Sequence, residues 1–153
     1  MPSRVAIALG SNIGDRRAHL DYAAFRLADL LDHFRVSPYL DTAPVDVAGE
    51  QPAFLNAAAV GDTALSPRDL LKVLLAVEAE RGRARPFPGA ARTLDLDLVL
   101  FGDRIIDEPG LIVPHPRFGE RRFVLEPLAQ IAPDMLDPIT GRSVAQLLDV
   151  IIG

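Results

Sequence analysis

The segment from Arg92 to Gly102, RTLDLDLVLFG, constrains the fold of this chain more than any other stretch. Leucine at every second position indicates a β-strand with one face in the core. The same alternation places Asp95 and Asp97 together on the other face, where neighbouring carboxylates repel each other. Aspartate is also a poor strand former. A divalent cation bound together with phosphates would stabilise two carboxylates at this spacing. For an isolated D-x-D, however, a solvated strand face is the commoner explanation.

Length and composition predict one globular domain, residues 1–153. The chain is 49% hydrophobic with a mean hydropathy of +0.19, which fits a packed core. It contains no cysteine, which excludes disulfides and thiolate metal ligands and makes the cytoplasm the default compartment. The apolar run Val5–Leu9 is too short for a signal peptide or a membrane span. A net charge of −5 argues against general nucleic-acid binding.

The basic residues are almost all arginine, since Lys72 is the single lysine among 16 basic residues. Arginine is suited to bidentate binding of phosphate, although a GC-rich genome would also favour it. Their clustering is therefore more informative than their identity. The clusters are Arg81, Arg83, Arg85 and Arg92, and then Arg117, Arg121 and Arg122.

Periodicity and turn residues predict a β-α-β-β-α-β order followed by a C-terminal addition. Asp15 and Ser66 are the expected N-caps of the two main helices, and Pro67 is expected at the first helical position. The predicted elements are strands at 4–10, 35–42, 54–60 and 92–102, a short segment at 105–106, a turn at 109–110, and helices at 16–33, 66–82, 121–131 and 143–152.

This order is typical of the ferredoxin-like α+β fold, an antiparallel sheet with both helices on one face. Asp95 and Asp97 would then lie on the open face, which the small Ala6 and Ala8 leave uncrowded. Asn56 is expected near Phe54 in the same neighbourhood. The residues predicted to face the helices are Leu94, Leu96, Leu98 and Leu100.

Several motifs occur together with the aspartate strand in one order along the chain. They are Gly10-Ser-Asn-Ile-Gly14, Thr42-Ala-Pro44, Phe54-Leu-Asn-Ala57, Glu78 followed by Gly82-Arg83, Arg92-Thr-Leu-Asp-Leu-Asp97, and Val113-Pro-His115 followed by Arg121-Arg-Phe123. Together they resemble the 6-hydroxymethyl-7,8-dihydropterin pyrophosphokinase family of folate biosynthesis, over about residues 4–136. The R-T-L-D-L-D block with the downstream P-H and R-x-F is the most specific part.

The resemblance implies the ferredoxin-like fold and transfer of a diphosphate from ATP to the pterin hydroxymethyl group, releasing AMP. Asp95 and Asp97 would hold two Mg²⁺ ions, and together with Arg83 and Arg92 they are the expected catalytic residues. In-line attack on phosphorus needs positioning and charge neutralisation more than covalent help. The sequence shows no dedicated general base, unless Asp97 serves.

The resemblance also assigns the ATP-binding residues. Arg83 and Arg92 correspond to phosphate-binding arginines on the segment 83–92, whose closure over ATP would exclude water. A solvated surface acid is the alternative for Glu78. The complete ATP set is Glu78, Arg83, Arg85, Arg92, Leu98, His115 and Arg121, whereas Arg117, Arg122, His19 and His33 are expected to be surface or packing residues.

For the pterin, the resemblance implies an aromatic pair, Phe54 and Phe123, that sandwiches the ring. The Asn56 amide offers both a donor and an acceptor to the pterin edge. The complete pterin set is Thr42, Pro44, Val45, Phe54, Asn56, Asp95 and Phe123.

The chain departs from the family at a few positions. Leu75 replaces a glutamine of some members, Pro116 replaces a common tyrosine, and Phe87 is the possible substitute for a loop tryptophan that this chain lacks. The segment 83–92 also looks about one residue shorter. These departures concern the adenine contacts and loop closure rather than the metal site.

Two other functions are compatible with part of this pattern. A metal phosphodiesterase would use the D-x-D but needs more acidic or histidine ligands. A ferredoxin-like module that senses a small molecule would not need paired acids opposite an arginine-rich segment. The expected partners are small molecules, with no nucleic acid and no membrane, and the expected state is a monomer.

Overall fold

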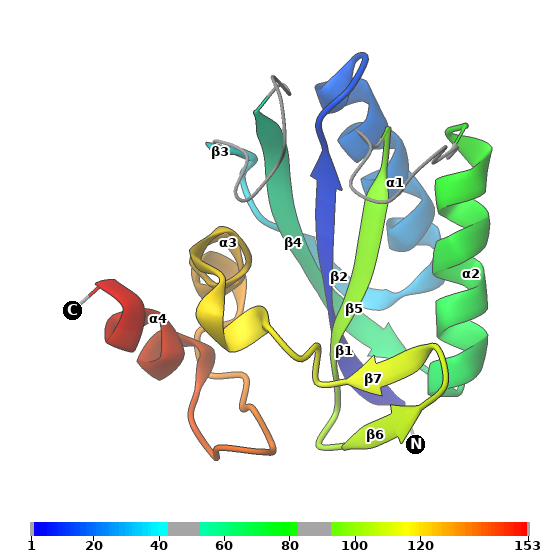
Figure 1. The fold of residues 1–153 in the computed structure, drawn as a ribbon. Coiled ribbons are helices and arrows are strands. Elements are labelled where there is room, and N and C mark those ends of the chain that lie inside the picture. The colour runs from blue at the N-terminus through cyan, green and yellow to red at the C-terminus, as the bar shows by residue number, and fades with distance from the viewer. Residues whose placement is uncertain (1, 43–52, 83–92, 153) are drawn as a thin grey trace.

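The computed structural model describes residues 2–42, 53–82 and 93–152, and it confirms the ferredoxin-like α+β fold. The main sheet has the strand order β2-β4-β1-β5, with β3 also paired to β4, and its pairings are antiparallel (Figure 1). The elements are β1 (Ser3–Ser11), α1 (Arg16–Leu30), β2 (Asp32–Val36), β3 (Leu40–Thr42), β4 (Phe54–Thr63), α2 (Pro67–Glu80), β5 (Asp95–Phe101), β6 (Ile106–Glu108), β7 (Leu111–Val113), the 3-10 turn η1 (Phe118–Glu120), α3 (Arg122–Ile131) and α4 (Val144–Ile152).

The two main helices begin at the predicted caps. The Asp15 side chain accepts a hydrogen bond from the Ala18 N–H at 3.1 Å, and the Ser66 hydroxyl accepts one from the Asp69 N–H at 3.1 Å. These bonds satisfy N–H groups that the first helical turn leaves without partners. Within the described ranges, no helix has both the length and the apolar character needed to cross a membrane.

The helices α1 and α2 cover one face of the sheet (Figure 1). Their apolar stripes, including Leu20 and Leu27 of α1 and Leu70 and Leu74 of α2, are fully buried. They form one core with sheet residues that include Leu94, Leu96 and Leu98.

The opposite face is only partly open, which corrects the expectation of a free face. A second core lies there, in which α3 residues such as Leu125 and Leu128 pack on Ala6, Ala58 and Val60 of the sheet. The small side chains of Ala6 and Ala58 therefore allow α3 to pack against the sheet. This second layer covers the part of the sheet around Ala6. At the Gly10 end of β1, the neighbouring side chains are instead Asn56 and Phe54.

A β-bulge overturns the predicted orientation of Leu100. Ile7 pairs with Leu98 but Ala6 pairs with Leu100, so Val99 is an extra residue on β5. A bulge shifts the alternation by one position. Leu100 therefore packs in the second core with α3.

The predicted strand at 35–42 is also wrong as a single element, since it divides into β2 and β3. Pro38 lies at the break and has no N–H for a strand ladder. Ser37 bridges the gap, because its N–H donates to the Ala58 carbonyl and its hydroxyl accepts the Ala58 N–H. The first helix ends at Leu30 rather than at residue 33, because Leu31 is already extended.

Candidate functional site

The two aspartates lie at the start of β5, on the face opposite the α1–α2 core. Asp95 pairs with Gly10 and Asp97 pairs with Ala8 of β1. Both side chains are partly buried, whereas Leu96 between them is buried in the core below. The bulge at Val99 lies beyond both aspartates, so their predicted orientation holds. The strand thus presents two carboxylates on one face and anchors itself through the other.

Gly10 connects the aspartates to the pterin-binding candidates. In the strand register it stands between Asp95 on β5 and Asn56 on β4. A Cβ at Gly10 would lie 3.3 Å from Asn56 Oδ1 and 3.6 Å from Phe54 Cδ1. Asn56 and Phe54 therefore share the face of the sheet that carries Asp95. A glycine at this register position allows the three side chains to converge.

The Asn56 amide is buried and held in one orientation. Its Nδ2 donates to the Thr42 hydroxyl at 2.5 Å, and only 6% of the residue is exposed. Thr42 pairs with Phe54 where β3 meets β4. The predicted residues Thr42, Phe54 and Asn56 thus form one cluster.

His115 lies within electrostatic reach of Asp95 and Arg121. Burial lowers the pKa of His115. The positive charges of Arg121 and Arg117 lower this pKa further, whereas the Asp95 carboxylate raises it. Its Nδ1 accepts the Arg117 N–H at 3.3 Å, so the neutral ring carries its proton on Nε2. The His115 N–H also bonds the Val99 carbonyl at 3.0 Å, which attaches this segment to β5. An imidazole donor is therefore held close to the aspartate strand.

Arg121 and Phe123 lie together at the start of α3. The Arg121 guanidinium is 5.5 Å from the centroid of the Phe123 ring, within the range of a cation–π contact. Both side chains are partly exposed. Arg122, by contrast, is an exposed residue paired with Glu126 at 2.9 Å, and Arg117 is exposed, as expected for surface charges.

Two predicted ATP-binding residues lie on the helix side of the sheet. Glu78 is only 2% exposed, and its Oε2 accepts the Leu96 N–H at 2.7 Å, so the alternative of a solvated surface acid is wrong. Leu98 is 6% exposed and its side chain belongs to the α1–α2 core. A nucleotide contact by Leu98 would therefore have to use its backbone.

The end of α2 is attached to α1 by a side-chain cluster that was not predicted from the sequence. Arg81 Nε donates to His19 Nδ1 at 3.0 Å, and the Arg81 guanidinium lies 4.8 Å from the Tyr22 ring centroid. Arg26 binds both carboxylate oxygens of Glu80, and Tyr22 donates to the same carboxylate. The spacing of residues 19, 22 and 26, which places them on one face of α1, is the sequence feature from which this cluster could have been predicted. His33, as expected, is on the surface, with 85% of its side chain exposed.

Five predicted site residues lie outside the described ranges, as does Phe87. They are Pro44, Val45, Arg83, Arg85 and Arg92.

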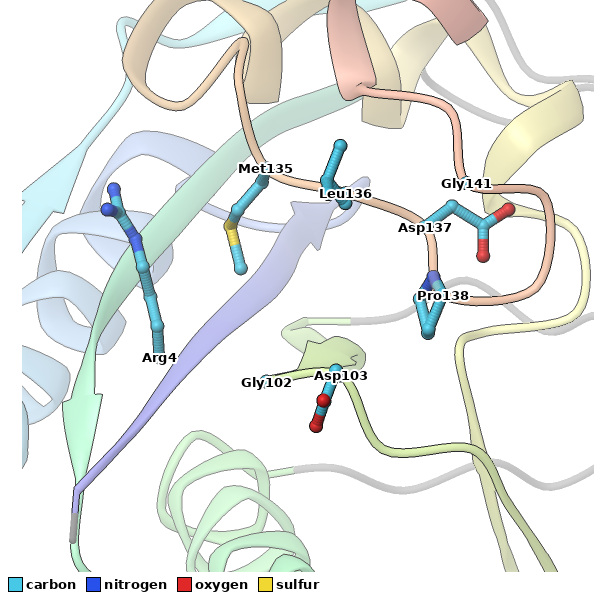
Figure 2. Close-up of a pocket in the computed structure, with 8 residues that line it drawn as sticks. All are labelled: Arg4, Gly102, Asp103, Met135, Leu136, Asp137, Pro138 and Gly141. Atoms are coloured by element: carbon cyan, nitrogen blue, oxygen red, sulfur yellow. The ribbon is translucent and has the colours of Figure 1, made fainter.

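A cavity of about 340 Å³ lies away from these residues, at the other end of β1 and β5. Arg4 and Gly102 line it together with Met135 and the loop from Leu136 to Gly141 (Figure 2). Arg4 is six positions before Gly10 on β1, or about 20 Å along a strand. The cavity is therefore separate from the Asp95 cluster.

The fold and the cluster define a class: a ferredoxin-like protein with paired carboxylates, an asparagine and a phenylalanine at one end of its sheet, and a histidine within electrostatic reach of one carboxylate and of an arginine. The sequence profile of the 7,8-dihydro-6-hydroxymethylpterin-pyrophosphokinase (HPPK) family matches residues 6–133. The chain belongs to this family, and it is an enzyme that transfers pyrophosphate.

Similar proteins agree with this family. A 2-amino-4-hydroxy-6-hydroxymethyldihydropteridine pyrophosphokinase of Pseudomonas aeruginosa is 44% identical over 150 residues, covering 97% of this chain and 91% of that protein. One from Bacillus subtilis is 42% identical over 142 residues, covering 92% of this chain and 84% of that protein. The crystal structure of wild-type Plasmodium falciparum HPPK-DHPS has the same fold, with a TM-score of 0.73 at 12% identity. This chain spans 41% of that longer chain, and 98% of this chain is covered.

Proposed function

We propose that this enzyme transfers diphosphate from ATP to the hydroxymethyl group of 6-hydroxymethyl-7,8-dihydropterin, with AMP as the second product. The observation that supports it best is the convergence of Asp95, Asn56 and Phe54 around Gly10. This arrangement places acidic ligands beside groups suited to a flat heterocycle with an amide edge. The reaction in folate biosynthesis follows from the family, and the positions of the described residues support the roles that the resemblance implies.

The donor set suits Mg²⁺ bound together with phosphates. Asp95 and Asp97 offer hard oxygen ligands from adjacent positions on one strand face. In the described part of the chain, no group of three or more Asp, Glu, His or Cys residues could hold a metal ion. Two carboxylates completed by water and substrate phosphates are a usual environment for Mg²⁺. When bound, Mg²⁺ supplies charge neutralisation on the triphosphate and acidifies the attacking hydroxyl.

The neighbouring side chains can bind and orient the two substrates. His115 is kept neutral by burial and nearby arginines, so its Nε2–H can donate to a phosphate oxygen. Arg121 adds a permanent positive charge with several donors. Phe54 and Phe123 offer ring faces for the pterin, and the fixed Asn56 amide recognises its polar edge. Orientation of the reacting groups is the main contribution that such residues make.

We also propose that the enzyme acts as a monomer in the cytoplasm. The strand residues of the candidate site, Asp95, Asn56 and Thr42, come from neighbouring strands of one sheet, so this part of the site is complete within a single copy. Size-exclusion chromatography with light scattering at working enzyme concentration would reveal a dimer.

The proposal is tested by measuring AMP release from ATP by the purified protein. AMP should form only when both the pterin and Mg²⁺ are present. Asp95→Asn and Asp97→Asn should each lower kcat/KM by at least about 100-fold. Asp107→Asn, which changes an exposed acid on β6, is the matched control and should retain full activity.

The product distinguishes this function from the alternatives. ADP or free phosphate in place of AMP would contradict diphosphate transfer. Full activity in both Asp95→Asn and Asp97→Asn would contradict their role as metal ligands.

A further inference from the structure

We propose that Glu78 is a positioning residue for the metal-binding strand, holding the peptide between Asp95 and Asp97. This inference rests on the proposed function of the two aspartates. The Glu78 carboxylate is buried near the end of α2 and accepts the Leu96 N–H at 2.7 Å. Leu96 is the residue between the aspartates, and it is itself only 4% exposed.

The position of β5 explains why its backbone needs such support. β5 is at the edge of the sheet, with β1 as its neighbour on one side. Along a strand in an antiparallel ladder, successive N–H groups point to alternate sides. Because the Leu96 N–H is directed to Glu78, the N–H groups of Asp95 and Asp97 face β1. The segment is therefore held by β1 on one side and by Glu78 on the other.

A carboxylate is a costly choice for a purely structural role at this position. Burying an ionised group costs free energy unless hydrogen bonds compensate for the lost water. An acid near the C-terminal end of a helix is also unfavourable for the helix dipole. A hydrogen bond from a peptide N–H to a carboxylate is stronger and more directional than one to a neutral acceptor. These features suit a residue that fixes a strand bearing two mutually repelling carboxylates.

The role differs from direct substrate contact. Glu78 reaches the Leu96 N–H from α2, a helix that packs in the core on the sheet face opposite Asp95 and Asp97. It would act on metal binding through the backbone of Leu96, as residues behind metal ligands commonly do.

The test combines amide hydrogen exchange with metal-dependent binding of a non-hydrolysable ATP analogue, α,β-methylene-ATP. In the wild-type protein, the Leu96 amide should exchange at least about 10-fold more slowly than an open edge amide. Glu78→Met keeps an unbranched side chain of similar length and removes the acceptor. It should abolish the extra protection of Leu96 and raise the Mg²⁺ concentration for half-maximal analogue binding by about 10-fold.

Two further variants separate positioning from stability. Glu78→Gln retains a carbonyl acceptor and should shift the Mg²⁺ midpoint much less than Glu78→Met. Leu70→Ala removes a fully buried side chain from the same helix and should lower the melting temperature without moving that midpoint.

The outcomes distinguish this inference from the proposed function. If Asp95→Asn and Asp97→Asn leave the Mg²⁺ dependence unchanged, the metal site and the positioning role both fail. If they abolish it while Glu78→Met behaves like Leu70→Ala, only the positioning role fails. Fast exchange of Leu96 in the wild-type protein would overturn the inference even if Glu78→Met did not fold.

Discussion

Asn56 and Thr42 are joined by a 2.5 Å hydrogen bond from the amide Nδ2 to the threonine hydroxyl. The bond fixes the amide so that Oδ1 is directed toward Gly10, where a Cβ would lie 3.3 Å from it. Because Asn56 is buried, its orientation is set by the protein before any ligand arrives. Such preorganisation lowers the entropic cost of binding a rigid heterocycle.

Thr42→Val should weaken pterin binding. The change removes the hydrogen-bond acceptor while keeping the shape, so Asn56 loses a bond worth about 1 kcal/mol. We expect the KM for the pterin to rise about 5-fold to 10-fold with little change in kcat, since the bond helps ground and transition states alike. Steady-state kinetics at saturating ATP measure this effect. Thr42→Ser retains the hydroxyl and should behave as the wild type, and equal KM values for all three proteins would refute the role.

Gly10→Ala should crowd the pterin-binding candidates. The added Cβ would lie 3.3 Å from Asn56 Oδ1, so this amide must shift by a few tenths of an ångström, whereas the 3.6 Å to Phe54 Cδ1 is an ordinary van der Waals contact. A misplacement of about 1 Å in a site can cost about 100-fold, so we expect a shift of a few tenths of an ångström to cost a few-fold in pterin affinity. The KM for the pterin should rise more than the KM for ATP.

Gly119→Ala is the control for this substitution. Its added Cβ would meet Leu147 Cδ2 at 3.8 Å, an ordinary van der Waals contact, so its kinetics should be unchanged. Equal changes in the two KM values of Gly10→Ala would show that the effect is not confined to the pterin side.

His19 should make the stability of the protein depend on pH. Burial, then the adjacent Arg81, lower its pKa below the usual value near 6.5, while Asp15 partly opposes them. The folded state therefore disfavours the protonated ring. The stabilisation is fully present above pH 6.5 and is lost as the pH falls below it. Protonation would also remove the Nδ1 acceptor used by Arg81.

His19→Asn tests this expectation, because Asn supplies an acceptor but does not titrate. Urea unfolding at pH 7.5 and pH 5.5 should show a smaller loss of stability on acidification for His19→Asn than for the wild type. His33→Asn removes an exposed histidine that pairs with Asp62 at 3.0 Å, and it serves as the comparison for loss of a surface imidazole. Identical pH dependence in His19→Asn and the wild type would count against the role of His19.

Leu125→Ala should destabilise the layer formed by α3. Leu125 is fully buried in the second core. Its truncation should cost about 2–5 kcal/mol of unfolding free energy. Leu136→Ala, at a residue that is 57% exposed, should change that value by less than about 0.5 kcal/mol. Chemical denaturation of both variants measures the difference, and a similar small effect in both would contradict a packed α3 layer.

Much of the fold could be predicted because its signals are local. The alternation in β5, the side chains of Asp15 and Ser66, and the order of elements are encoded by neighbouring residues, and the structure confirms them. The break between β2 and β3 could also have been predicted from the local sequence, because Pro38 lies within the predicted strand. The site was harder to predict, because its members come from β1, β3, β4, β5 and the segment around His115.

The sequence alone determined the chemistry of this protein: the paired Asp95 and Asp97, the arginine clusters and the motifs that mark its family. Only the tertiary structure decided which side chains meet. The bulge at Val99 turns Leu100 toward α3, and Glu78 reaches the Leu96 N–H from another element. The physical reason is that periodicity reports how one segment alternates, whereas a bulge and a buried hydrogen bond depend on partners distant in sequence.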